Sequence, residues 1–132
     1  PESRCITEDL RLHGWMARDD PSWPAEAHME MYGSDGPAVT EFLAADPSLN
    51  TPLHPRLPYL RGQLVWAARH EMARTVDDVL ARRTRSLLLD ARAAIEVASD
   101  AARLLAGELG HDEAWISSQT TDFQDLARGY LP

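Results

Sequence analysis

The strongest constraint on the fold lies between Asp90 and Gly110, where the sequence predicts one long amphipathic helix. Asp90 is of a type that caps helix N-termini, and glycine commonly follows a helix end, as Gly110 does here. Small and apolar residues recur at helical spacing on one side, at Ala94, Ala98, Ala101, Leu105 and Leu109. Charged and polar residues occupy the other side, at Arg92, Glu96, Ser99, Asp100 and Arg103. A helix with such a long apolar side must pack against other elements.

Similar patterns predict further helices on both sides of this one. The expected helix starts are Ser22, Ser34 or Asp35, Tyr59, Thr75, Asp90 and Asp112. The last helix is expected to carry one stripe formed by Trp115, Gln119, Phe123, Leu126 and Tyr130. The apolar run Leu87–Leu89 is expected to be buried. We therefore expect an all-α fold, a compact bundle of about six helices.

The N-terminal residues follow a different pattern. Residues 1–20 are expected to form an extended arm or linker, in which Leu10–Gly14 alternates like a short strand. A single strand cannot form a sheet, so the segment would pack as an arm or pair outside this chain. The helical domain is then expected to span residues 21–132. The chain begins at Pro1 and reads as a piece of something longer.

Composition is that of a globular domain with one hydrophobic core. The chain has 132 residues, of which 44% are hydrophobic and 26% charged. The sequence has no apolar run approaching the roughly 20 residues that a membrane span needs, and no signal peptide is visible. Cys5 is the only cysteine, which excludes an internal disulfide. These features favour a cytoplasmic location.

Charge argues against nucleic acid as a partner. The net charge is −8, and all thirteen basic residues are arginine. Residues 51–103 carry an excess of arginine, whereas the segments on either side are acidic. Nucleic-acid binding depends on a basic face that displaces counterions, and the chain as a whole lacks one. The middle segment can still present a local positive patch.

The sequence contains no recognisable catalytic, cofactor or metal motif. Its seven glycines never form the GxGxxG or GxxxxGK[ST] patterns that hold phosphate groups. His70-Glu71 begins like the zinc motif HExxH, but Arg74 stands where the second histidine would be. We therefore expect no catalytic residue, no bound cofactor and no metal site in this chain.

The segment from Thr75 to Arg85 is the best candidate for a functional surface. Thr75 and Asp78 have the spacing of a capping box, and Asp78 precedes Arg82 by the four residues that favour an ion pair. Arg82, Arg83 and Arg85 then concentrate positive charge at the end of the segment.

Three interpretations of this arginine cluster remain open. The arginines can form internal ion pairs with Glu71, Asp77 or Asp78, which is the usual fate of a charge run. They can make an interdomain contact, because guanidinium groups suit interface ion pairs. They can also bind a phosphate-bearing anion, which would require a bidentate geometry.

The same segment carries a family resemblance. "TVDDVLARRTR" (Thr75–Arg85), together with "LRLHGW" (Leu10–Trp15), "MYGSDGPAV" (Met31–Val39) and "PYLRGQLVWAARHEMA" (Pro58–Ala73), resembles the C-terminal domain of FAD-dependent glycerol-3-phosphate dehydrogenases and alpha-glycerophosphate oxidases. The blocks span most of the chain in the order that the family shows. None of them is a catalytic motif.

The resemblance implies a non-catalytic accessory domain of a larger oxidoreductase. The parent would oxidise sn-glycerol 3-phosphate to dihydroxyacetone phosphate, with FAD as its cofactor and membrane quinone, or oxygen in the oxidases, as the electron acceptor. The flavin and substrate residues would belong to the preceding domains, on which this chain would pack. The parent could form a homo-oligomer and meet the inner membrane face peripherally; any membrane association of this chain would come through that parent.

A free-standing helical interaction module is the alternative, with the basic middle segment meeting an acidic partner. The two readings differ in one feature. An accessory domain should leave apolar surface exposed around Leu12 and Trp15, whereas a self-contained module should bury it.

Overall fold

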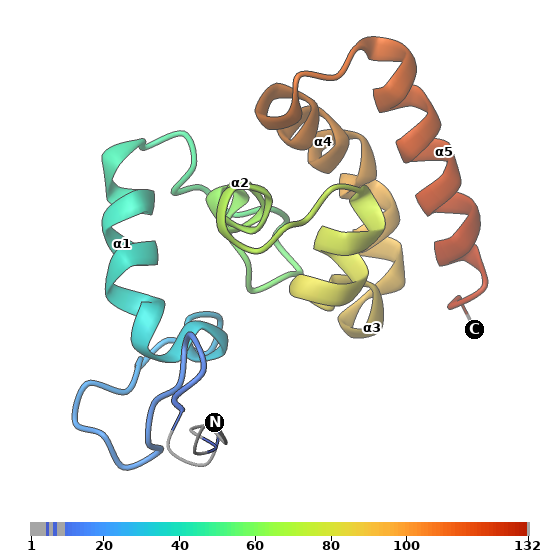
Figure 1. Ribbon diagram of the computed structural model, residues 1–132. Helices are drawn as coiled ribbons and strands as arrows, with labels where there is room; N and C mark the ends of the chain where they lie inside the picture. The colour runs from blue at the N-terminus through green and yellow to red at the C-terminus, as the bar shows by residue number, and fades with distance from the viewer. Residues whose placement is uncertain (1–4, 6, 8–9, 132) are drawn as a thin grey trace. The chain divides into compact units, whose positions relative to one another are not determined.

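The computed structural model describes residues 5, 7 and 10–131. In chain order its elements are the 3₁₀-helix η1 (Glu30–Asp35), α1 (Gly36–Ala45), α2 (Arg61–His70), the π-helical segment η2 (Asp78–Arg83), α3 (Ser86–Leu89), α4 (Ala91–Leu109) and α5 (Glu113–Arg128) (Figure 1). No named strand occurs among the described residues, which confirms the all-α class. The strand considered at Leu10–Gly14 is wrong, because this segment forms loop and turn without a pairing strand.

The chain divides into two compact units, residues 1–40 and residues 41–132. In the first unit the loop that follows Trp15 is closed by contacts at two glycines, Gly14 and Gly33. The amide of Ser34 donates to the carbonyl of Gly14 at 3.3 Å. Gly33 has φ 50° and ψ −122°, and a Cβ added there would lie 1.9 Å from the same carbonyl oxygen. Only glycine fits this position.

The helix expected between Ser22 and Tyr32 is replaced by turns that lead into η1. The reason is a hydrogen-bonded turn at the residue that was expected to start the helix. The carboxylate of Asp20 accepts hydrogen bonds from both the amide and the hydroxyl of Ser22, which closes a local turn. The Ser22 hydroxyl is thereby engaged with Asp20, two residues earlier, and does not cap a helix.

The second unit is built around α4, which packs against α2, α3, η2 and α5 (Figure 1). The predicted apolar side of α4 is buried, with Ala94, Ala98, Ala101 and Leu105 each 0% exposed. Its N-cap is also as expected, because the carboxylate of Asp90 accepts from the amide of Ala93 at 2.9 Å. Gly110 ends the helix in the left-handed conformation. The alanines allow close approach of the neighbouring helices.

Two apolar segments of this unit differ from expectation. Leu87 is buried, but Leu88 and Leu89 are 66% and 59% exposed, so the prediction of a fully buried run is wrong. The reason is that α3 is a single turn, and consecutive residues of a helical turn point in different directions. The stripe expected on α5 is also only partly buried: Phe123 is covered, whereas Leu126 and Tyr130 are 45% and 54% exposed.

Helix α2 ends in a backbone conformation that is uncommon for its residue type. Met72 has φ 59°, which lies in the left-handed region that glycine normally occupies. The amides of Glu71 and Ala73 both donate to the carbonyl of Ala67 at 3.0 Å. This closure turns the chain sharply and leads it directly into the Thr75–Arg85 segment.

Candidate functional site

The candidate site begins with the two residues expected to cap the segment. The amide of Thr75 donates to Asp78 Oδ2 at 3.0 Å, and the amide of Asp78 donates to Thr75 Oγ1 at 3.1 Å. This reciprocal pair has the geometry of a capping box. Burial alone would raise the pKa of Asp78, but amide donors from Arg74 and Thr75 and the nearby Arg82 charge hold it below its ordinary value. The carboxylate is therefore a fixed anion at neutral pH.

The segment beyond this cap is π-helical where the sequence indicated an ordinary helix. The amide of Thr84 donates to the carbonyl of Val79, five residues earlier, at 3.0 Å. The Thr84 hydroxyl donates to the same carbonyl at 2.7 Å and contacts the Ser86 hydroxyl, also at 2.7 Å. Because both hydroxyls are buried, these bonds satisfy groups that would otherwise be costly to remove from water.

The three arginines of the cluster diverge in the structure. Arg82 binds Asp77 at 2.6 Å and Asp78 at 2.9 Å. Arg83 donates to the backbone carbonyl of Glu71 at 2.6 Å, and its Nε lies 3.4 Å from the Glu71 carboxylate. Arg83 thereby ties η2 to the end of α2. The side chains do not converge on a common point with their donors free, as an anion clamp would require.

Arg85 is the member of the cluster left without such a partner. It is exposed and has φ 54°, and it makes no ion pair with any carboxylate in the described part of the chain. Its carbonyl accepts from the amides of Leu88 and Leu89 and so starts α3. The guanidinium is thus the one in the cluster that remains available for an outside contact.

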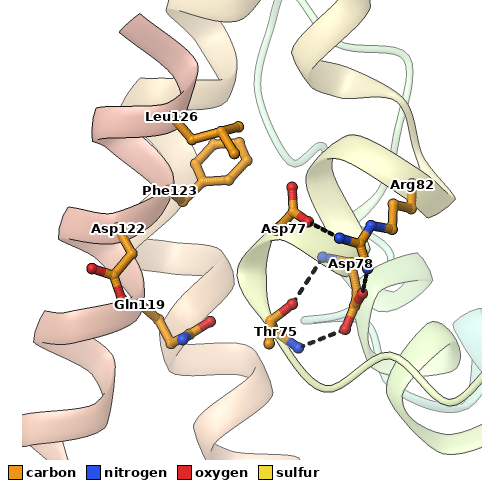
Figure 2. A pocket seen from close by; sticks show the side chains of 8 residues that line it. All are labelled: Thr75, Asp77, Asp78, Arg82, Gln119, Asp122, Phe123 and Leu126. Carbon is orange, nitrogen blue, oxygen red and sulfur yellow. Dashed lines mark hydrogen bonds and ion pairs between the residues drawn. The ribbon is translucent and has the colours of Figure 1, made fainter. Parts of the chain in front are cut away.

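A groove of about 350 Å³ runs between this segment and α5 (Figure 2). One wall is formed by Thr75, Asp77, Asp78 and Arg82, and the other by Gln119, Asp122, Phe123 and Leu126. The walls are joined where Gln119 Oε1 accepts from the amide of Val76 at 3.1 Å. Three carboxylates and one guanidinium line the groove, so it has a net negative charge beside an apolar floor.

A second groove, of about 440 Å³, lies between α3 and the residues that follow α5. It is lined by Leu87, Leu88, Leu89, Asp90, Ala91, Arg92, Tyr130 and Leu131. Asp90 is already engaged by its cap and by Arg56, whereas Arg92 is exposed and makes no ion pair within the described residues. This groove therefore combines apolar walls with the exposed guanidinium of Arg92 and the carboxylate of Asp90.

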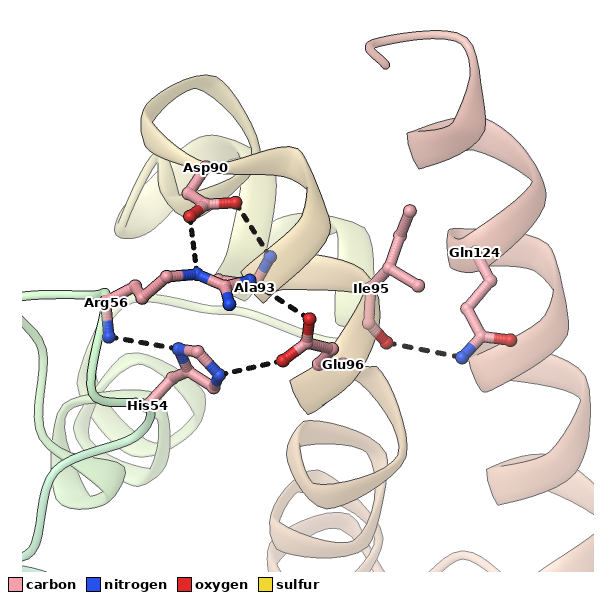
Figure 3. Close-up of polar contacts among 7 residues, drawn as sticks. All are labelled: His54, Arg56, Asp90, Ala93, Ile95, Glu96 and Gln124. Carbon is pink, nitrogen blue, oxygen red and sulfur yellow. Dashed lines mark hydrogen bonds and ion pairs between the residues drawn. The ribbon is translucent and has the colours of Figure 1, made fainter.

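A polar cluster that sequence reasoning missed holds the loop between α1 and α2 onto α4 (Figure 3). Arg56 binds Asp90 at 2.8 Å and Glu96 at 3.0 Å, and His54 Nε2 lies 3.0 Å from Glu96. Hydrogen bonds from Arg56 and His54 lower the pKa of Glu96. Figure 3 also shows Gln124 donating to the carbonyl of Ile95, which ties α5 to α4. No motif marks the cluster, because its members are far apart in sequence.

The described residues were also compared with the arrangements that hold metal ions and nucleotides. Across residues 5, 7 and 10–131, no three His, Cys, Asp or Glu side chains gather closely enough to hold a metal ion. The same residues contain no strand leading through a glycine-rich turn into a helix, the arrangement that holds a dinucleotide in doubly wound folds. None of the helices in the described part of the chain has the length and apolar character needed to cross a bilayer.

Comparison with known proteins identifies the family of this chain. A family model described as the C-terminal domain of alpha-glycerophosphate oxidase matches residues 5–116. The chain belongs to this family. The match covers all but the first four residues of the arm, α1, α2 and the whole Thr75–Arg85 segment, and it confirms the resemblance found in the sequence.

The relatives of this C-terminal domain are much longer proteins. It is 38% identical over 85 residues to the "Probable glycerol-3-phosphate dehydrogenase, mitochondrial" of Caenorhabditis elegans, covering 64% of this chain and 11% of that protein. It is 30% identical over 95 residues to glycerol-3-phosphate dehydrogenase 2 of Mycobacterium tuberculosis, covering 72% of this chain and 16% of that protein. The matched segments thus span only 11–16% of these relatives. No solved structure matches the chain significantly.

Proposed function

We propose that this chain is the C-terminal accessory domain of an FAD-dependent glycerol-3-phosphate dehydrogenase and that it packs on the catalytic domains of the same polypeptide. The parent enzyme oxidises sn-glycerol 3-phosphate to dihydroxyacetone phosphate and passes the electrons to quinone. FAD and substrate are held by the preceding domains. The family match carries this proposal, together with the short share of each relative that the chain covers.

The first unit supports an accessory role over a free-standing module. Leu10, Leu12 and Trp15 are 56%, 74% and 48% exposed, and the guanidinium of Arg11 lies over the Trp15 ring. Large apolar side chains gathered on one short arm mark a contact surface, and aromatic and arginine residues are common anchors in such contacts. We assign this arm to the contact with the catalytic domains, and Arg85 as a further candidate contact.

The location of the parent follows from its electron acceptor. We further propose that the parent works in the cytoplasm, peripherally at the inner membrane face, because an enzyme that delivers electrons to quinone works at a membrane surface. In this proposal any membrane association of the chain comes through the rest of the parent. Its proposed role is structural, because it covers and stabilises the catalytic domains.

The arm contact can be tested by producing the 132-residue chain and the rest of its parent polypeptide as separate proteins. The two are expected to form a complex, and Leu12→Asp is expected to weaken it by about thirtyfold or more, because it places a charge at the centre of an apolar contact. Titration calorimetry measures both affinities. Arg103→Ala, which alters an exposed side chain of α4, serves as the matched control and should bind normally. A complex insensitive to Leu12→Asp would contradict the assignment.

A further inference from the structure

Two residues hold a backbone conformation that side chains rarely adopt; one precedes the Thr75–Arg85 segment and the other ends it. Met72 has φ 59° and Arg85 has φ 54°, and apart from glycine they are the only described residues with a positive φ. In this left-handed region the Cβ atom lies too close to the following carbonyl oxygen, so glycine is the residue that fits without strain. Each of the two side chains is therefore carried at a cost in stability.

Contacts within the described residues do not explain why these side chains are present. Met72 is 79% exposed, the highest value among the large apolar side chains described. Arg85 is exposed and makes no ion pair with a described carboxylate. Burial raises the pKa of Tyr59, and the charge of Arg85 opposes that rise without forming a bond. A glycine at Met72 or Arg85 would thus relieve strain and remove little burial.

The two left-handed turns are tied to each other by one side chain. Arg83 donates to the carbonyl of Glu71 at 2.6 Å, and its Nε lies 3.4 Å from the Glu71 carboxylate. Met72 directly follows Glu71, and Arg85 is two residues beyond Arg83. The π-helical segment η2 lies between the turns. Strained residues and π-helical turns are both concentrated at functional sites, so the two exposed side chains call for a partner outside the described residues.

We propose that Met72 and Arg85 form a second contact with the catalytic domains of the parent polypeptide, on a surface that presents apolar side chains beside a carboxylate. This inference rests on the proposed function and names the chemistry of that contact. A thioether adapts to an irregular apolar surface, and a guanidinium suits an interface ion pair. The arm around Leu12 belongs to residues 1–40, whereas Met72 and Arg85 belong to residues 41–132. Each compact unit then has a contact of its own.

The charge of Arg85 selects a surface that bears a carboxylate. Most arginines of residues 41–132 already pair with a carboxylate of the chain, namely Arg56, Arg61, Arg69, Arg82, Arg83 and Arg128. Arg92 and Arg103 are exposed without such a pair, but they lie in the regular helix α4, where arginine is a favourable residue. Arg85 alone combines a free guanidinium with a strained backbone. A carboxylate on the catalytic domains would complete its ion pair.

The test replaces each residue with glycine and measures two quantities that should change in opposite senses. Met72→Gly and Arg85→Gly are each expected to raise the midpoint of thermal unfolding of the 132-residue chain by about 2–4 °C, because left-handed strain is removed. Each is also expected to weaken the complex with the separately produced remainder of the parent by about tenfold, because a contact side chain is lost. Circular dichroism measures the first quantity and titration calorimetry the second.

Arg103→Gly is the matched control, because it makes the same change at an exposed arginine whose backbone is helical. It is expected to lower the unfolding midpoint by about 2–4 °C and to leave the affinity unchanged. The carboxylate partner is tested with salt. Raising the ionic strength is expected to weaken the original complex more than the Arg85→Gly complex, because screening acts on an ion pair that the variant lacks.

The outcomes separate this contact from the arm contact. Glycine variants that bind as tightly as the original chain overturn the inference, and the arm assignment stands if Leu12→Asp still weakens the complex. Glycine variants that fail to raise the unfolding midpoint overturn the argument from strain, and the inference with it. Equal salt dependence of the Arg85→Gly and original complexes excludes the carboxylate. If the two parts form no complex at all, both the proposed function and this inference are wrong.

Discussion

Replacing Leu80 with alanine is expected to lower the free energy of unfolding by about 2–5 kcal/mol. Leu80 is 0% exposed and belongs to the core cluster that α2, α4 and α5 enclose. Removing its side chain takes away apolar contacts and leaves a space that the π-helical backbone of η2 cannot easily close. Urea unfolding followed by circular dichroism measures the change.

Leu88→Ala provides the matched control, because it removes the same atoms from a side chain that is 66% exposed. Its expected cost is at most about 0.5 kcal/mol. Equal losses for the two variants would contradict the burial of Leu80 and the exposure of Leu88 that the structure shows.

Replacing Gly62 with alanine is expected to destabilise the chain by about 1–3 kcal/mol, although alanine is the better helix former. A Cβ at this position would lie 2.4 Å from Leu43 Cδ2 and 2.9 Å from Leu49 Cβ. The backbone there cannot move away freely, because the Gly62 amide donates to the carbonyl of Leu49 at 2.8 Å. Thermal and urea unfolding report the loss.

Gly107→Ala makes the same chemical change in α4, where nothing lies within 4 Å of the added Cβ. Here only the gain in helix propensity remains, and a stabilisation of about 0.5–1 kcal/mol is expected. The two variants should therefore have opposite signs. A stabilising Gly62→Ala would show that Leu43 and Leu49 do not approach Gly62 as closely as the structure has them.

Helices α4 and α5 could be predicted from sequence because their signals are local. Asp90 and Asp112 accept from the amides of Ala93 and Trp115, three residues ahead of each. A cap, an apolar period and a final glycine all lie within one segment, so no knowledge of distant residues is needed. The all-α class followed from the same signals.

The parts that differ from expectation depend on competition between neighbours. Ser22 is a good helix cap by type, but Asp20 binds it first. Val79 would accept an ordinary helical hydrogen bond, but the buried Thr84 offers it both an amide and a hydroxyl. Helix propensity takes no account of such competing hydrogen bonds, because each one depends on a particular side chain in a particular turn.

The candidate site could be predicted from the sequence only in part, for a related reason. The contact of Arg82 with Asp78 is encoded in spacing along one helical turn. The contact of Arg83 with the Glu71 carbonyl depends on the left-handed turn at Met72, and Asp122 reaches the groove only through the packing of α5. These contacts arise from tertiary structure, and no periodic pattern in the sequence indicates them.

In the proposed enzyme the arm around Leu12 makes the contact with the catalytic domains. Leu10, Leu12 and Trp15 are 56%, 74% and 48% exposed in this chain. Exposed apolar side chains of this size are what such a contact surface requires.

The central claim is that the parent polypeptide is a flavoprotein dehydrogenase. In it, this chain is needed to pack against the catalytic domains and takes no part in the reaction. It is tested most directly by expressing the complete open reading frame that encodes the chain, and the 132-residue chain alone. Flavin absorbance and glycerol 3-phosphate oxidation with an artificial electron acceptor are then measured for both. We predict bound FAD and turnover in the complete protein, and neither in the isolated chain. A flavin band in the isolated chain, or a complete protein without flavin and without turnover, would contradict the account.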